Sequence, residues 1–187
     1  MRTRLIGALA AICLALPGVG TAHHLAVSDG NDVDGVLDIR RVAVYGRPPT
    51  WNIVTHGRWR ARSIWDRGFL VVAFNTFASA RYDYYALIRS TGRRLRAELY
   101  RDRTKKRDYK VSSLKTWRPD RRSVKVRVPL DRMTIGKKRR YYRWHAQSLL
   151  TGPDCRRTCL DLAPDRSGVR ESLAPPPESS AARSRTS

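Results

Sequence analysis

The feature that most constrains the fold is the stretch 68–76 (GFLVVAFNT), which contains six consecutive apolar residues. A run of this length, rich in β-branched and aromatic residues, is typical of a β-strand and too short for a buried helix. An unbroken apolar run indicates a strand that is covered on both faces or lies near the centre of a sheet. The stretch therefore predicts a central strand around which the other elements are arranged.

Seven further strands are predicted from alternation and from turn residues between the runs. Val124, Val126 and Val128 alternate with Lys125 and Arg127, which is the period of two expected of a half-buried strand. No stretch shows a convincing amphipathic helix, and the segment before the apolar run predicts a loop with at most one helical turn. Including that run, the predicted strands cover 37–45, 50–55, 68–75, 82–89, 95–100, 111–117, 124–128 and 141–150.

This pattern favours an all-β fold: a two-sheet antiparallel β-sandwich of about eight strands, jelly-roll-like, with a closed barrel as the alternative. The aliphatic stems of arginine and lysine can cover the outer sheet faces of so charged a chain. In the first predicted strand, Leu37 and Ile39 lie on one face but Val42 and Val44 have the opposite parity. This phase change predicts a β-bulge or a change of partner sheet.

The N-terminus has the pattern of a secretory signal peptide. Arg2 and Arg4 precede an apolar segment over 5–16, and small residues follow at 20–22. The apolar segment is too short to span a membrane. We therefore expect export, with a mature start near His23 and a secreted or cell-wall-associated protein; an unprocessed N-terminal helix is the alternative.

The chain is expected to contain one folded domain. We expect a signal peptide over 1–22, a flexible acidic turn over 23–35, a β-sandwich over 36–162 and a disordered tail over 163–187. The tail contains three consecutive prolines and few apolar residues, a composition that cannot build a core.

The charge is strongly unbalanced, with 38 basic against 16 acidic residues and a net charge of +22. Such a field attracts polyanions in a salt-dependent way, although a surplus of solvated arginines is the alternative. Two basic runs flank predicted strands, and basic side chains beside tyrosines suit phosphate contact and stacking. We expect the partner to be an extracellular or cell-wall polyanion or polysaccharide; solvated hairpin tips are the alternative. The candidate contacts are Arg103, Lys105, Lys106 and Arg107 in one run and Lys137, Lys138, Arg139, Arg140 and Tyr141 in the other.

Tryptophans cluster around the loop before the apolar run. Trp51, Trp59 and Trp65 lie within fifteen residues, with His56 among them. If exposed, these side chains would form a platform on which sugar rings stack, and the protein would be a carbohydrate-binding module. The alternative is that each tryptophan belongs to the core.

The segment 29–35 (DGNDVDG) is an acidic cluster in a basic chain. Asp29, Asn31, Asp32 and Asp34 supply oxygens of the kind that bind calcium, but Val33 occupies the fifth position of the loop, where an EF-hand needs a ligand. We therefore favour a solvated turn and expect no cofactor, with calcium as the less favoured alternative.

Two cysteines remain after the predicted leader. Cys155 and Cys159 predict a local disulfide in an oxidising compartment, with a metal site or free thiols as alternatives. A zinc site would need two further ligands.

No catalytic motif is present, so we expect a non-catalytic protein. An extracellular hydrolase is the remaining alternative. It would require the fold to bring Asp66 together with Asp83 or with His56.

The order of the motifs LDIRRV, GFLVVAFNT, YDYYALIR, SVKVRVPLDRM, YYRWHAQSLL and CRRTCLDLAPD resembles that of secreted, arginine-rich actinobacterial hypothetical proteins with a β-sandwich pattern. The arrangement is more distantly similar to carbohydrate-binding β-sandwich modules, which implies a binding role. Some related sandwiches carry acids in the connection after the central strand. Here that connection, 75–81, contains none, and the resemblance implies no calcium or acid–base site there.

Overall fold

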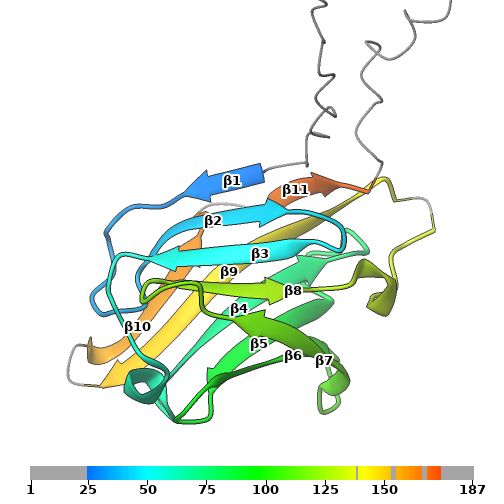
Figure 1. Cartoon of the computed structure of the whole chain (residues 1–187). Helices are drawn as coiled ribbons and strands as arrows, with labels where there is room; N and C mark the ends of the chain where they lie inside the picture. The colour runs from blue at the N-terminus through cyan, green and yellow to red at the C-terminus, as the bar shows by residue number, and fades with distance from the viewer. Residues whose placement is uncertain (1–24, 138, 153–154, 166–167, 174–187) are drawn as a thin grey trace, which may run out of the picture.

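A computed structural model describes residues 25–137, 139–152, 155–165 and 168–173, and the fold within them is all-β (Figure 1). Two short 3-10 helices, η1 (Ala61–Ile64) and η2 (Leu130–Arg132), are the helical elements of this part. The strands are β1 (Leu25–Ser28), β2 (Ile39–Tyr45), β3 (Thr50–Thr55), β4 (Gly68–Asn75), β5 (Tyr84–Ser90), β6 (Leu95–Arg101), β7 (Tyr109–Trp117), β8 (Ser123–Arg127), β9 (Tyr141–Gly152), β10 (Cys155–Ala163) and β11 (Val169–Ser172).

Some predictions fall outside the described residues, namely the signal peptide over 1–22 and the part of the tail over 174–187. Within the residues that the structure describes, no helix has the length and apolar character needed to cross a bilayer.

The strands pair antiparallel in the order β1-β2-β3-β8-β7-β6-β5-β4-β9-β10, and β11 also pairs with β9. Figure 1 shows β2, β3 and β8 in one layer and β9, β4, β5 and β6 in the layer behind it. Strand β7 joins the layers, and β2 also contacts β10, so the sheet is nearly closed into a barrel. This confirms the predicted all-β fold.

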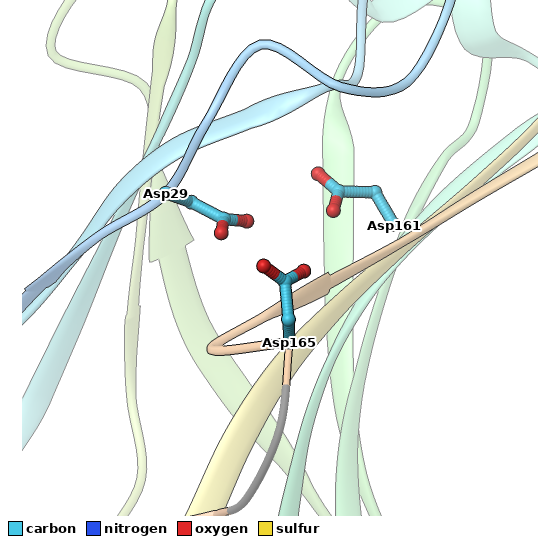
Figure 2. A group of neighbouring side chains, drawn as sticks. All are labelled: Asp29, Asp161 and Asp165. Carbon is cyan, nitrogen blue, oxygen red and sulfur yellow. The ribbon is translucent and has the colours of Figure 1, made fainter.

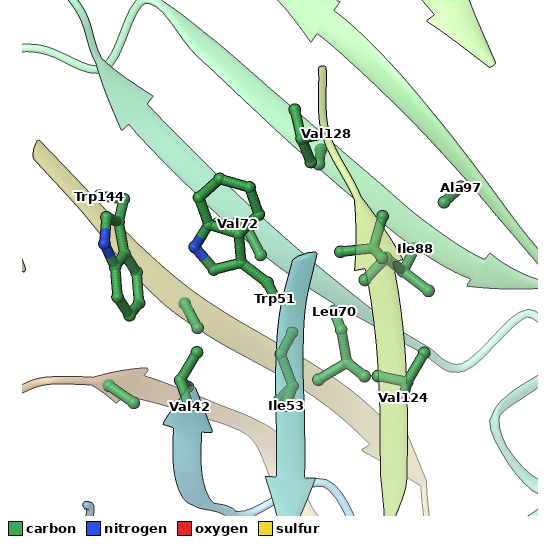
Figure 3. Packing of buried hydrophobic residues seen from close by; sticks show 14 of the residues in the cluster. Val42, Trp51, Ile53, Leu70, Val72, Ile88, Ala97, Val124, Val128 and Trp144 are labelled. Atoms are coloured by element: carbon green, nitrogen blue, oxygen red, sulfur yellow. The ribbon is translucent and has the colours of Figure 1, made fainter. Parts of the chain in front are cut away.

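The apolar run is β4, and it lies between β5 and β9 as a central strand of its layer. Leu70 and Val72 point into the core between the layers (Figure 3), and Phe74 is fully buried in the same core. Trp51 of the opposite layer packs edge-to-face on Phe74, with ring centroids 5.0 Å apart, and on Trp144 at 6.3 Å. Strand β4 therefore organises the core, as its sequence predicts.

All eight predicted strands are present, and the loop before β4 contains the single helical turn η1. The phase change in β2 is a real irregularity, because the register with β3 shifts between Ile39 and Arg41. This shift allows Ile39 and Val42 to be buried together although their parity differs.

Three strands were not predicted. β1 lies within the segment 23–35, which was expected to be a flexible turn, and it pairs with β2. β11 lies within the expected disordered tail and pairs with β9. The predictions of a flexible turn and of a disordered tail were therefore wrong at these two strands. Each has four residues, too few for a clear period. In β10 the apolar pattern is inverted, since Leu160 and Leu162 are exposed while Asp161 is buried. An inverted pattern gives no local signal of a core strand.

Candidate functional site

A cationic groove opens where β6 and β7 separate. Ala97 pairs with Leu114, but beyond this point β7 leaves β6 and pairs with β8 through Lys115 and Trp117. The first residues of β6 therefore pair with β5 along one edge and, among the described residues, have no strand partner along the other. The space between the diverging strands, bordered by η1, has a volume of about 870 Å³.

Basic side chains dominate this groove. No aspartate or glutamate is among its lining residues, and within the described part of the chain none of its basic groups forms an ion pair. Uncompensated positive charges around a concave surface focus a positive potential. The basic residues of the cationic groove are Arg93, Arg94, Arg96, Lys115 and Arg118.

Two tryptophans support this basic surface. Trp117 lines the groove, and Lys115 Nζ and Arg127 Cζ each lie 5.9 Å from its ring centroid. The guanidinium of Arg118 lies 3.7 Å from the ring centroid of Trp59 and donates to the Trp59 carbonyl at 2.8 Å. Burial lowers the pKa of Arg118, and its Nε has no hydrogen-bond partner. The groove therefore holds one basic group in a fixed position.

The basic runs predicted from sequence lie elsewhere. Both runs are at the end of the sheet where β4, β6 and β8 finish, opposite to the cationic groove (Figure 1). In the β6–β7 hairpin the four predicted side chains are exposed. In the β8–β9 connection, the Arg139 side chain already has partners within the protein. It donates a hydrogen bond to the Phe77 carbonyl at 3.2 Å and lies over the Tyr141 ring. Lys137 and Arg140 are exposed, and Lys138 lies outside the described residues.

The predicted three-tryptophan platform is not formed. Trp51 is 0% and Trp59 2% exposed, so both are core residues and this part of the prediction was wrong. The physical reason is that their rings fill the space between the layers, and the Trp59 indole donates to Thr55 Oγ1 at 3.1 Å. Of the three, Trp65 alone is exposed, at 53%. His56 lies beside Asp38, whose carbonyl accepts its backbone N–H at 2.8 Å.

Trp65 borders a second hollow, the Trp65 groove, on the outer face of β4 and β5. It has a volume of about 690 Å³ and includes Phe69, Tyr85, Leu87 and Arg89. The Trp65 ring packs closely over Gly92, whose φ of +87° favours glycine. An exposed indole is thus held beside an apolar and aromatic surface.

The aspartate cluster lies where the two ends of the sheet approach each other. Asp29, Asp32 and Asp38 come from the β1–β2 connection, and Asp161 and Asp165 from the end of β10. Carboxylate oxygens of Asp29, Asp161 and Asp165 all lie within 4.8 Å of one another, and those of Asp32, Asp38 and Asp161 do so too. Figure 2 shows the side chains of Asp29, Asp161 and Asp165 pointing toward one another. Asp161 belongs to both groups.

Burial and mutual repulsion dominate the electrostatics of the aspartate cluster. Burial, with the charges of Asp161, Asp165 and Asp32, raises the pKa of Asp29 to about 7. Burial and Asp161 also raise the pKa of Asp38 to about 6, partly opposed by His56 and the Val33 backbone. The pKa of Asp161 is raised chiefly by burial. Among the described residues no lysine or arginine forms an ion pair with these carboxylates.

The sequence predicted only part of this cluster. Asp29 and Asp32 belong to it, whereas Asn31 and Asp34 are not among its grouped side chains. Asp38, Asp161 and Asp165 were missed. No local pattern could have linked Asp38 to Asp161 and Asp165, because more than 120 residues lie between them in the sequence.

The predicted disulfide between Cys155 and Cys159 is confirmed, with Cα atoms 5.7 Å apart. It lies under the β1–β2 connection, where a Cβ on Gly35 would come within 3.2 Å of Cys155 Sγ. Gly35 has a φ of +103°, so the connection needs glycine both for conformation and for space. The disulfide therefore helps to place the loop that carries Asp29, Asp32 and Asp38.

The residues of the hydrolase alternative show no shared site. Asp83 Oδ2 accepts hydrogen bonds from the backbone N–H groups of Thr76 at 2.7 Å and Phe77 at 3.1 Å, and so holds the β4–β5 connection. Asp66 is exposed at the Trp65 groove, and His56 lies beside Asp38.

Comparison of the chain with models of protein families, with curated proteins and with solved structures finds no match in any of the three. The resemblance to secreted actinobacterial proteins therefore stays an expectation, and function is inferred from the chain's own residues.

Proposed function

We propose that this chain is an exported, non-catalytic binding protein that holds an extended anionic polymer in the cationic groove. The observation that carries the proposal is the lining of the groove, which has five basic side chains and no carboxylate. Asp120, outside the lining, interacts electrostatically with Arg118. Phosphate, sulfate or carboxylate groups spaced along a polymer would supply the missing counter-charges. The signal-peptide pattern supports export.

The shape of the groove supports a polymer more than a small anion. It follows two diverging strands and continues to the β5–β6 turn, where Thr91 lines it and the neighbouring Ser90 lines the Trp65 groove. Trp117 offers a flat ring between basic groups, which suits stacking beside charge contacts.

The test measures binding of the mature chain to a labelled heparin fragment and to single-stranded DNA at two salt concentrations. We expect binding that weakens steeply with salt. The groove variant Arg94→Ala with Arg96→Ala should weaken it about tenfold or more, because two ionic contacts are lost. The better of the two ligands identifies the class of polymer.

A matched control removes the same charge at the opposite end of the sheet. Arg103→Ala with Arg107→Ala changes two exposed arginines of the β6–β7 hairpin, and we expect a smaller loss of affinity. Equal losses in both variants would show that net charge, not the groove, drives binding. Absence of binding to either ligand at moderate salt would remove the proposal altogether.

A second candidate function is neutral glycan binding at the Trp65 groove. The exposed ring of Trp65 beside Phe69 and Tyr85 is the observation that favours it. Binding to an insoluble polysaccharide should then survive high salt and be lost in Trp65→Ala. Trp117→Ala serves as the matched control, since it removes an indole from the other groove. Retention of polysaccharide binding by Trp65→Ala would dismiss this candidate.

A further inference from the structure

The aspartate cluster contains buried carboxylate oxygens with no partner. Asp38 and Asp161 are each 2% exposed. Neither oxygen of Asp38 accepts a hydrogen bond of ordinary geometry, and the same holds for Asp161 Oδ1 and Asp29 Oδ2. Buried charged oxygens are normally paired or bound to a metal, because their desolvation is otherwise uncompensated. A bound cation would supply the missing compensation.

The ligand set selects the kind of cation. All the grouped side chains are aspartates, and neither cysteine nor histidine is among them, which favours a hard cation over zinc or copper. Calcium takes six to eight oxygens at about 2.4 Å, so ligands on opposite sides of one ion lie about 4.8 Å apart. The oxygens of each group lie within 4.8 Å of one another. Magnesium usually keeps most of its waters and binds one or two carboxylates, so it fits this crowded set less well.

The position of the cluster gives such an ion a structural task. Asp161 Oδ2 accepts the backbone N–H of Ile39, which links β10 to the start of β2 across the seam where the sheet nearly closes. The other aspartates lie on both sides of this seam. Without a cation their mutual repulsion pushes the two edges apart, whereas a bound cation draws them together.

We propose that the aspartate cluster is a calcium site that closes the seam between β2 and β10, with Asp161 shared by its two groups of ligands. The proposal is independent of the polymer bound in the cationic groove, since the ligands and the groove have no residue in common.

The test compares the thermal midpoint Tm of the mature chain in calcium chloride, in magnesium chloride and in EDTA, together with calcium titration calorimetry. At calcium about a hundredfold above Kd, the linkage relation predicts a rise in Tm of about 5–10 °C. Magnesium at the same concentration should give a smaller rise. No calcium binding up to about 10 mM together with an unchanged Tm would overturn the proposal, because even weak extracellular sites bind below that range.

Three variants locate the site. Asp161→Asn keeps an oxygen for the Ile39 N–H but removes the shared charge, and it should abolish the calcium-dependent rise in Tm. Asp165→Asn changes an exposed member and should fold even if the first variant does not; it should lower calcium affinity about tenfold. Asp131→Asn removes an exposed carboxylate on η2 and should respond to calcium as the wild type does. A wild-type response in both Asp161→Asn and Asp165→Asn would place the calcium elsewhere and refute the assignment.

Discussion

Glu98 and the aspartate cluster both bury carboxylates, but of the two, within the described residues, only Glu98 forms ion pairs with lysine and arginine. Glu98 is 3% exposed, accepts hydrogen bonds from Lys110 Nζ, from Arg89 at 3.0 Å and from the Tyr100 hydroxyl at 2.8 Å, and has a lowered pKa. The pKa values of Asp29, Asp38 and Asp161 are raised instead. With 38 basic residues in the chain, counter-charges are plentiful. Among the described residues no lysine or arginine forms an ion pair with the aspartate cluster, which is why we propose a bound cation as its counter-charge.

The largest effect is expected when Glu98 is made to resemble the aspartate cluster. Lys110→Met removes its closest counter-charge and leaves Arg89 as its remaining ion-pair partner, and breaking one contact of a buried charge network is destabilising. We expect a loss of about 2 kcal/mol in the free energy of unfolding at pH 7, measured with urea. Lys105→Met, at an exposed position of the same hairpin, is the control and should change little. Equal stability of the two variants would show that Glu98 does not depend on Lys110.

The disulfide should distinguish the two regions, because it adjoins the β1–β2 connection and not Glu98. Replacing both Cys155 and Cys159 by alanine should lower the free energy of unfolding by about 2 kcal/mol. Amide hydrogen exchange over 29–38 should accelerate more than exchange over 97–99, since the loop loses a neighbour at Gly35. Equal acceleration in both segments would contradict a local role.

The pH dependence of stability should report Glu98 directly. Its pKa in the folded state is lower than the ordinary value of 4.5, because Lys110 and Tyr100 hydrogen-bond the charged form. Glu98 therefore stabilises the fold above about pH 4.5, and this contribution is lost as the pH falls through its folded pKa. Glu98→Gln should be less stable than wild type by about 1 kcal/mol at pH 7, and the two should converge as the pH falls below the folded pKa of Glu98. A difference that is independent of pH would mean that packing, not charge, explains the effect.

The smallest effect, of opposite sign, is expected at an exposed member of the aspartate cluster. In EDTA, Asp32→Asn removes one of several like charges and should raise Tm by about 1–2 °C. In saturating calcium the same variant should be less stable than wild type, because a ligand is lost. Asp131→Asn, outside the cluster, should show neither change. A lower Tm for Asp32→Asn in EDTA would indicate that the carboxylates are compensated within the protein.

Much of the fold could be predicted because strand signals are local. The apolar run of β4, the alternation of β8 and the phase change in β2 each arise from a few neighbouring residues whose side chains must face core or solvent. Strand β10 could not be predicted, since it buries Asp161 and exposes Leu160 and Leu162. It buries an aspartate where hydrophobicity alone would place a leucine.

Less of the candidate sites could be predicted. The acidic segment 29–35 drew attention to calcium, but the buried ligands Asp38 and Asp161 come from residues that only sheet closure brings together. The cationic groove was missed because it depends on where β7 leaves β6 for β8. Nothing in the residues around Leu114 signals that change of partner.

By itself the sequence determined that the chain forms alternating strands around the apolar run of β4 and joins Cys155 to Cys159, because these outcomes depend on residues close together in the chain. Only the tertiary structure decided which charges meet. Ile39 and Asp161 are 122 residues apart, and they touch because a nearly closed sheet returns its last strands to its first. That closure gathers the aspartates at the seam, while the change of partner in β7 leaves, at another edge, a groove lined by basic groups and by no carboxylate.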